Sequence, residues 1–143
     1  LTSFKVLYQK NNEVISILEK IKDMKSPKLN RLDIDYHCFT LYQQLVAIEK
    51  RLIDTSNALF LMNNLLKEGL VFYLRKMGFF VPKDKKILDL IKKDNDHLYQ
   101  MSISFINESN IEKRFNLIKN IIDEVLKPYG VLKEWKKGPF PLK

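Results

Sequence analysis

Apolar residues recur every three or four positions along most of this chain, the spacing that places them on one face of an α-helix. The first such run follows Asn12 and ends before Pro27, because Ser26 precedes a proline and is biased away from helical geometry. The pattern predicts a helix over residues 12–24. Its apolar face would comprise Val14, Ile15, Ile17, Leu18, Ile21 and Met24.

A second run begins near Asp33, a residue type that caps helices, and continues to residue 77. One straight helix over residues 33–77 would be roughly 68 Å long at 1.5 Å per residue, too long for a compact domain. The polar group DTSN at residues 54–57 can end one helix and cap the next. We therefore expect two long antiparallel helices. Their apolar stripes would be Ile34, Leu41, Leu45, Ile48 and Leu52, then Leu59, Met62, Leu66, Leu70, Tyr73 and Met77.

Beyond this hairpin, Gly78 suits a left-handed helix stop, and GFFVPKD at residues 78–84 is typical of a connector. Asp84 is expected to cap a fourth helix, and KDND at residues 93–96 to bend or restart it.

The last long helix has the cleanest stripe in the chain. Ser109 and Glu112 have the spacing of a capping box that would open it, and Pro128 would end it. Its apolar face would comprise Ile111, Phe115, Ile118, Ile122 and Val125.

Together these runs predict an all-α fold, an antiparallel bundle of about five helices in a single domain over residues 1–143. Residues 1–11 would be an extended lead-in, because FKVLY at residues 4–8 has the content of a short strand. The bundle would occupy residues 12–127. Residues 128–143 would form an irregular C-terminal arm, because this segment contains several glycines and prolines.

The formal net charge of +8 favours acidic partners such as nucleotides, nucleic acid or an acidic protein face, although lysine-rich helices are also simply well solvated. The single cysteine, Cys38, cannot form an internal disulfide, which fits a reducing compartment. No apolar run reaches the roughly 18 residues needed to span a bilayer, and no basic-then-apolar leader is present. We therefore expect a cytoplasmic protein without a membrane partner.

The stretch RLDIDYH at residues 31–37 is the main candidate for chemistry. Arg31 and His37, with two carboxylates between them, could form an RNA-cleaving site, or the stretch could be a loop that starts a helix. A zinc site is not expected, because no spaced CxxC or HxxxH pair is present. Cys38 follows His37 directly, and neighbouring helical residues point about 100° apart, so the two do not form a catalytic pair unaided.

Trp135 stands among the lysines of the C-terminal segment, at positions 133, 136 and 137. An aromatic side chain flanked by lysines can stack on bases or dock on a partner. We favour docking of Trp135 back onto its own bundle.

The order of elements resembles a known group of helical domains. A short strand-like entry into a helix, FKVLYQKNNEVISILEKI, is followed by two long helices, then by LRKMGFFVPKDKKILDLIKK and SNIEKRFNLIKNIIDEVLKPYG. This layout resembles the helical domain that follows or partners minimal nucleotidyltransferases, within the HEPN and nucleotidyltransferase substrate-binding group. The nucleotidyltransferase signature, a G-S pair followed by D-x-D, is absent, since Asp33-Ile34-Asp35 follows no such pair.

The resemblance implies a non-catalytic domain that needs no cofactor. It would bind a nucleotide or another acidic substrate beside a nucleotidyltransferase subunit or domain, and would act as a homodimer. Arg75, Lys83, Lys85 and Lys86 around the connector are the candidate phosphate contacts. The N–H groups at the start of the fourth helix would add donors.

Two alternatives remain. The ribonuclease branch of the HEPN group carries an Arg and a His separated by four to six residues, which Arg31 and His37 match. In that branch the motif lies late in the bundle and a polar residue follows the Arg, whereas here it precedes the hairpin and Leu32 follows. We therefore favour the helix-starting loop over a ribonuclease toxin. The other alternative is a structural adaptor that docks another helical chain.

Overall fold

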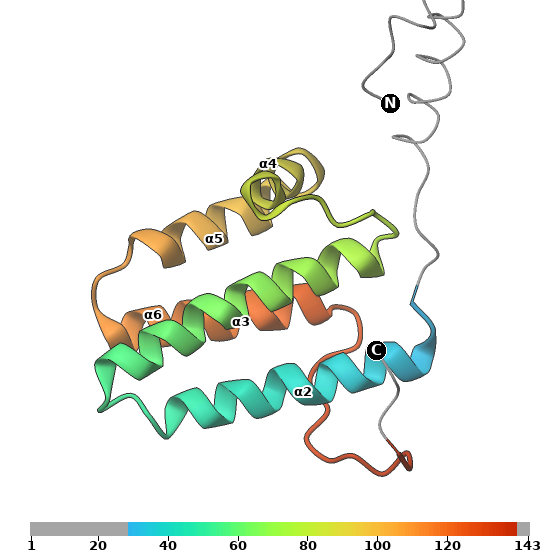
Figure 1. Ribbon diagram of the computed structural model, residues 1–143, viewed down its shortest axis with the longest axis horizontal. Helices are drawn as coiled ribbons and strands as arrows, with labels where there is room; N and C mark the ends of the chain where they lie inside the picture. The colour runs from blue at the N-terminus through green and yellow to red at the C-terminus, as the bar shows by residue number, and fades with distance from the viewer. Residues whose placement is uncertain (1–28, 140–143) are drawn as a thin grey trace, which may run out of the picture.

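The structure, a computed structural model, describes residues 29–139 and contains five α-helices in that range (Figure 1). The lead-in predicted at residues 1–11 and the helix predicted at residues 12–24 lie outside the described residues. The prediction of an all-α antiparallel bundle is confirmed. The helices are α2 (Arg31–Glu49), α3 (Thr55–Lys76), α4 (Asp84–Asp94), α5 (Asp96–Asn107) and α6 (Ile111–Leu126).

The predicted hairpin is present, with α2 and α3 antiparallel and side by side (Figure 1). Asp54 caps α3 by accepting from the backbone N–H of Asn57 at 3.4 Å, as the DTSN group indicated. At the other end of α3, Gly78 has a φ of 86°, and the N–H of Phe79 donates to the carbonyl of Leu74 at 2.9 Å. This is the left-handed helix stop that the glycine predicted.

Two of the other predicted N-caps are wrong, by three residues and by one, and in both cases an asparagine takes the role. The side chain of Asn30, not Asp33, caps α2 and accepts from the N–H of Asp33 at 2.8 Å. Asn110, not Ser109, caps α6 and accepts from the N–H of Lys113 at 2.9 Å. Asparagine is as good a cap as aspartate or serine, so each helix starts where an asparagine can reach back to its first turn.

Two related expectations also need correction. Asp84 is the first residue of α4 rather than its cap, and Lys83 before it makes no capping hydrogen bond. The stretch at residues 31–37 is not a loop, because it forms the first two turns of α2. The cap at Asn30 starts the helix early enough to include all of it.

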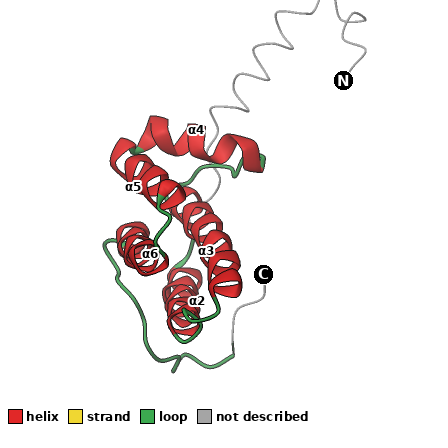
Figure 2. Ribbon diagram, turned by 90° about the vertical axis from the view of Figure 1, so that its left-hand side faces the viewer, coloured by secondary structure: helices red, strands yellow, loops and turns green. Residues whose placement is uncertain are grey.

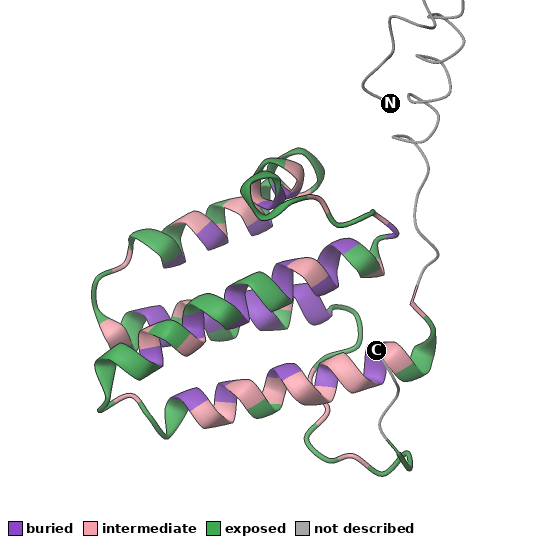
Figure 3. Cartoon of the chain, in the orientation of Figure 1, coloured by how far each residue is buried: buried purple, intermediate pink, exposed green. Residues whose placement is uncertain are grey.

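The core lies where α3 packs between α2 and α6, and α3 also contacts α4. Figure 2 shows α2, α3 and α6 nearly end-on around this core, and Figure 3 shows their buried positions facing one another. Gly69 sets the close approach of α3 to α6, because a Cβ there would lie 2.9 Å from Cδ1 of Ile122. The stripe predicted for α6 faces this core, with Phe115, Ile118, Ile122 and Val125 all buried.

α4 lies across one side of the bundle formed by the other helices (Figure 2). The predicted restart occurs at Asn95, which ends α4 and caps α5. The hydroxyl of Tyr73 ties this corner to α3 by donating to Oδ2 of Asp94 at 2.6 Å. Burial and this bond to a carboxylate raise the pKa of Tyr73 to about 12, so the hydroxyl keeps its proton. Ile87 and Ile91 are buried and form the inner face of α4. Because this face packs on the core, the opposite face of α4 is directed to solvent.

Beyond α6, residues 127–139 form an irregular arm that returns to α2. The N–H of Leu132 donates to the carbonyl of Cys38 at 3.2 Å. The ring of Trp135 lies 6.0 Å from that of Tyr36 and 5.9 Å from that of Phe39, between centroids. The expectation that Trp135 docks on its own bundle is confirmed. Within residues 29–139, no helix has the length and apolar character needed to cross a membrane.

Candidate functional site

Arg31 and His37 do not converge. Six positions along a helix leave two side chains about 120° apart around its axis. The Nε–H of Arg31 donates to Oδ1 of Asp35 at 3.0 Å. The ring of His37 stacks on Phe72 of α3, with 4.9 Å between centroids, and its Nδ1 lies 2.8 Å from the carbonyl oxygen of Asp33. Since a carbonyl only accepts, this nitrogen carries the proton. Each side chain is therefore held in a local structural contact.

Cys38 is inert in this setting. Burial raises the pKa of its thiol to about 11, and the nearby carboxylate of Asp35 acts in the same direction. The thiolate is the reactive form of cysteine, so a thiol that stays protonated near neutral pH is a poor nucleophile. Cys38 is 2 % exposed and belongs to the core.

Asp35 is the buried carboxylate that fastens the arm to α2. It is 6 % exposed and accepts from Arg31, while the amine of Lys137 lies 3.2 Å from Oδ2. Burial alone would raise its pKa, but the bonds from Arg31 and Lys137 outweigh burial and hold the pKa below the ordinary value of 3.8. A carboxyl group whose pKa is lowered by folding stabilises the fold at every pH above its ordinary pKa. This contribution is lost as the pH falls through the folded-state pKa.

Replacing Asp35 by asparagine should therefore release the arm. The chain has one tryptophan, so the fluorescence of Trp135 reports arm docking directly. We expect Asp35→Asn to shift its emission to the red at neutral pH, and wild type to show the same shift only below about pH 3.8. Glu134→Gln is the matched control, because its ion pair with Lys136 is solvent-exposed. Identical emission of Asp35→Asn and wild type at neutral pH would show that the arm docks without this carboxylate.

Two neighbouring cations at the end of α3 have different roles. The amine of Lys76 is half-buried and donates to the carbonyl of Val125 at 2.6 Å and to that of Lys127. It thereby satisfies carbonyls at the C-terminal end of α6, where a helix attracts cations. Arg75, one of the candidate phosphate contacts, points to solvent. Lys76 is structural, whereas Arg75 is accessible to a ligand.

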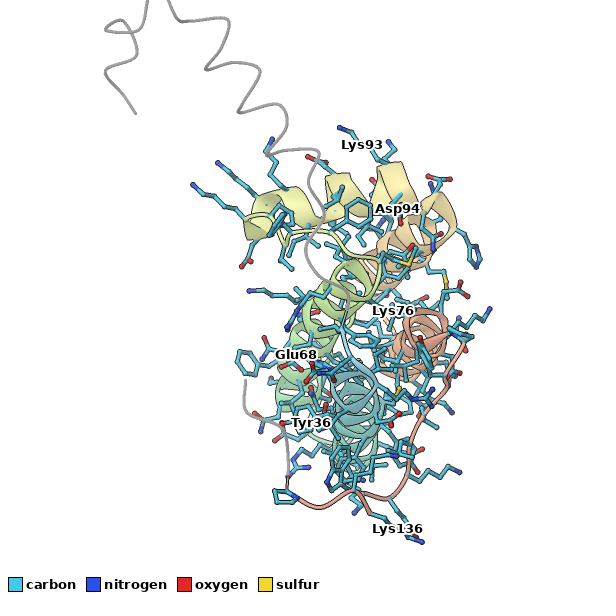
Figure 4. The ribbon with its side chains drawn as sticks, turned by 90° about the vertical axis from the view of Figure 1, so that its right-hand side faces the viewer. Tyr36, Glu68, Lys76, Lys93, Asp94 and Lys136 are labelled. Atoms are coloured by element: carbon cyan, nitrogen blue, oxygen red, sulfur yellow. The ribbon has the colours of Figure 1, made fainter. Side chains whose placement is uncertain are left out.

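The outward face of α4 carries four lysines in two pairs. Lys85 and Lys86 occupy the first turn, and Lys92 and Lys93 follow seven residues later, so each pair lies about two turns or 10.5 Å from the other on the same side. All four are exposed. Figure 4 shows Lys93 at the outer edge of the molecule, on the side of α4 away from the bundle. We call these four lysines the α4 lysine face.

These amines are largely uncompensated. Within residues 29–139, none of the four forms an ion pair with a carboxylate. Lys92 lies over the ring of Tyr99, with its amine 5.3 Å from the centroid. Exposed Asp89 lies between the two pairs on the same side and reduces their field. Asp84 and Asp94, at the two ends of the helix, are engaged by Lys67 and by the hydroxyl of Tyr73. The α4 lysine face can therefore attract a group with several negative charges.

The arm lysines contrast with these. Lys137 pairs with Asp35, Lys136 pairs with Glu134 at 3.1 Å, and Lys127 pairs with Glu124 at 3.0 Å. Lys133 lies over the ring of Tyr42. The arm therefore packs against the bundle, and most of its lysines are paired with carboxylates. Figure 4 shows Lys136 at the end of the molecule opposite α4.

The start of α4 differs from the expected phosphate site. Lys83 is exposed, but Asp84 occupies the first helical position and pairs with Lys67 of α3 at 2.8 Å. A carboxylate in the first turn already offsets the positive end of the helix. Asp84 and Lys67 also border a pocket of about 180 Å³ between α3 and α4. Its other lining residues are mostly apolar, namely Asn63, Leu66, Leu70, Ile87 and Leu88.

The sequence hypothesis therefore identified only the first half of the cationic surface. Lys85 and Lys86 are on the α4 lysine face, whereas Lys92 and Lys93 were missed. The signal was present, since a seven-residue step along a predicted helix returns to the same side. The predicted bend or restart at KDND, residues 93–96, places Lys93 at the break and so hides this relation.

Comparison with known proteins identifies no relative. No protein-family model, curated protein or solved structure matches this chain. Within residues 29–139, no group of three or more His, Cys, Asp or Glu side chains is placed to hold a metal ion.

Proposed function

We propose that this chain is a non-catalytic helical domain that binds a phosphate-bearing ligand, such as a nucleotide, through the α4 lysine face. The observation that carries the proposal is the charge on this side of α4, where four exposed amines lie with Asp89, while the two other carboxylates of the helix, Asp84 and Asp94, are engaged by Lys67 and Tyr73. Lysine amines bind phosphate as mobile point charges, and two pairs about 10.5 Å apart can contact more than one phosphate group. Arg75 in the last turn of α3 and Lys83 just before α4 are two further exposed cations, one on each side of the connector along the chain.

The proposal includes association with a nucleotidyltransferase subunit or domain. Its support is the resemblance in the order of helices and in the connector segment. In that arrangement the partner would supply the chemistry, and this domain would hold the charged substrate. The local engagement of Arg31 and His37 supports a binding role over a ribonuclease role, because neither side chain is presented toward the other.

Calorimetric titration with ATP, GTP and UTP at low ionic strength tests the binding. We expect a dissociation constant below about 1 mM for the triphosphates, and weakening as salt is added. Similar affinity for the three nucleotides is expected, because lysines contact phosphate rather than base. Failure of all three to bind at millimolar concentration, to this chain and to its complex with a nucleotidyltransferase, would refute the proposal.

Homodimer formation belongs to the same proposal. Large apolar side chains are exposed around the α2–α3 turn and nearby, with Ile53 99 % exposed and Phe60 65 % exposed. Such side chains are available to a second copy or to another helical chain. Light scattering should give about twice the chain mass of 17.0 kDa. A monomer mass at all concentrations would remove the homodimer and leave the binding face untouched.

A further inference from the structure

The connector between α3 and α4 presents an exposed aromatic side chain a few residues before the α4 lysine face begins. Phe79 packs partly against the core, but Phe80 is 56 % exposed. The backbone on either side is restricted, by the left-handed turn at Gly78 and by Pro82. The exposed ring is therefore held by an anchored loop rather than by a free chain end.

Cations flank this ring on both sides along the chain. Arg75 precedes Phe80 by five residues, and Lys83 follows it by three. Three residues span at most about 11 Å, so the lysine amine can reach the space beside the ring. The α4 lysine face then continues away from the connector for two turns. An exposed aromatic followed by spaced amines is the combination by which proteins hold single strands, with bases on the rings and phosphates on the cations.

We infer that the ligand of this face is single-stranded nucleic acid, with a base stacked on Phe80 and the following phosphates on the lysines of α4. This inference rests on the proposed function and specifies its ligand. A duplex fits less well, because its bases are already stacked on one another and their faces are not open to an aromatic side chain. A single strand offers unstacked bases and the same phosphate charge.

A membrane surface is the other polyanion that attracts lysines near an aromatic side chain. An amphipathic helix binds a membrane with its apolar face in the lipid. The apolar face of α4 is unavailable, since Ile87 and Ile91 are 4 % and 0 % exposed and pack in the core. The exposed apolar side chains Phe80 and Val81 lie at one end of the lysine face and not along it. This arrangement favours a strand that passes from the ring to the amines.

Fluorescence anisotropy with labelled oligo(U) and oligo(dT) of about 20 nucleotides tests the inference. A hairpin duplex and phosphatidylserine-containing vesicles serve as competing ligands. We expect wild type to bind both single strands more tightly than the duplex or the vesicles. Phe80→Ala should weaken single-strand binding about tenfold, while Phe80→Trp should retain it. Phe80→Ala should leave the dependence on salt unchanged, because a stacking contact releases no counterions.

Phe60→Ala is the matched control. Phe60 is also an exposed phenylalanine, but it lies on α3 about 24 Å along the helix from its C-terminal end. Its loss should leave binding at the wild-type level. If Phe80→Ala binds single strands as well as wild type does, or if duplex or vesicles are preferred, the inference is wrong. After either result, charge reversal on α4 (Lys86→Glu with Lys93→Glu) decides the fate of the proposed function. If the reversal still abolishes ligand binding, the proposed function stands and only the inference fails. If binding persists, both fail.

Discussion

Replacing Arg114 by methionine is expected to lower the free energy of unfolding by about 3 kcal/mol, because several charge-assisted hydrogen bonds are lost together. Arg114 is 8 % exposed and lies in the first turn of α6. Its Nη1 donates to the carbonyls of Ile106 at 3.2 Å and Glu108 at 3.0 Å, and its Nη2 donates to Oδ1 of Asn63 at 2.8 Å. One side chain thus joins the end of α5, the following loop and α3.

The expected loss of unfolding free energy is smaller than the summed contributions of the three hydrogen bonds, for two reasons. Burial disfavours the guanidinium and lowers its pKa, and its Nε has no hydrogen-bond partner among residues 29–139, so the native contact already carries a desolvation cost. Asn63 is exposed, so water can replace part of what the methionine variant loses. Against this, the guanidinium carbon lies 4.3 Å from the centroid of the Phe105 ring, and that packing is lost as well.

Urea unfolding measures the effect. Arg51→Met is the matched control. In the part of the chain that the structure describes, the exposed side chain of Arg51 donates only to the carbonyl of Ala47, one turn earlier, so its loss should change stability by less than about 0.5 kcal/mol. Arg114→Lys should fall between the two, because it keeps the charge but not the planar fork. Full wild-type stability of Arg114→Met would mean that burying this charge costs as much as its bonds return.

Reversing two charges on the α4 lysine face, Lys86→Glu with Lys93→Glu, should weaken nucleic-acid binding about 100-fold at low salt. The two positions lie on one line of the helix, seven residues apart, so a bound polyanion loses two attractive contacts and meets two repulsive ones. Both residues are exposed, and glutamate is a good helix former, so the fold should remain intact by circular dichroism.

The control changes net charge equally at another place. Lys113→Glu with Lys119→Glu replaces two exposed lysines of α6 and should alter affinity only a few-fold. Asp89→Asn should act in the opposite direction and tighten binding, because it removes the carboxylate between the two lysine pairs. Equal losses for the α4 and α6 double variants would mean that overall charge, and not a site, governs binding.

The bundle was predictable because its long helices bury repeating stripes. The hairpin, the stop at Gly78 and the stripe of α6 all follow from the local pattern of apolar residues and breakers. The N-caps at Asn30 and Asn110 were missed because several neighbouring residues can cap equally well, and the choice depends on where packing starts the helix.

Contacts between distant segments were less accessible from the sequence. One side of α2 packs on the bundle core. Another side, which carries Tyr36 and Phe39, packs against the C-terminal arm almost a hundred residues later in the chain. Periodicity along α2 cannot identify which segment covers that side. The side-chain partner of Arg114 is likewise 51 positions away, at Asn63, and periodicity along α6 cannot identify it.

The candidate site was predictable in part, because some of its residues follow from local pattern and others from contacts between distant segments. Lys83, Lys85 and Lys86 were found because they cluster beside the connector, and Lys92 and Lys93 follow from helical geometry once α4 is known to run unbroken to Asp94. That this face points outward depends on the burial of Ile87 and Ile91. What the sequence could not supply is the neutralisation of the arm lysines by Asp35 and Glu134.

The most direct measurement is the salt dependence of single-strand affinity for wild type and for the Lys86→Glu, Lys93→Glu variant. Each phosphate contact contributes about −0.7 to the slope of log K against log salt for a single strand, so loss of two contacts should flatten the slope by about 1.4. The α6 double variant should keep the wild-type slope. Equal slopes for wild type and the α4 variant would contradict the claim that this face holds the phosphates of a ligand.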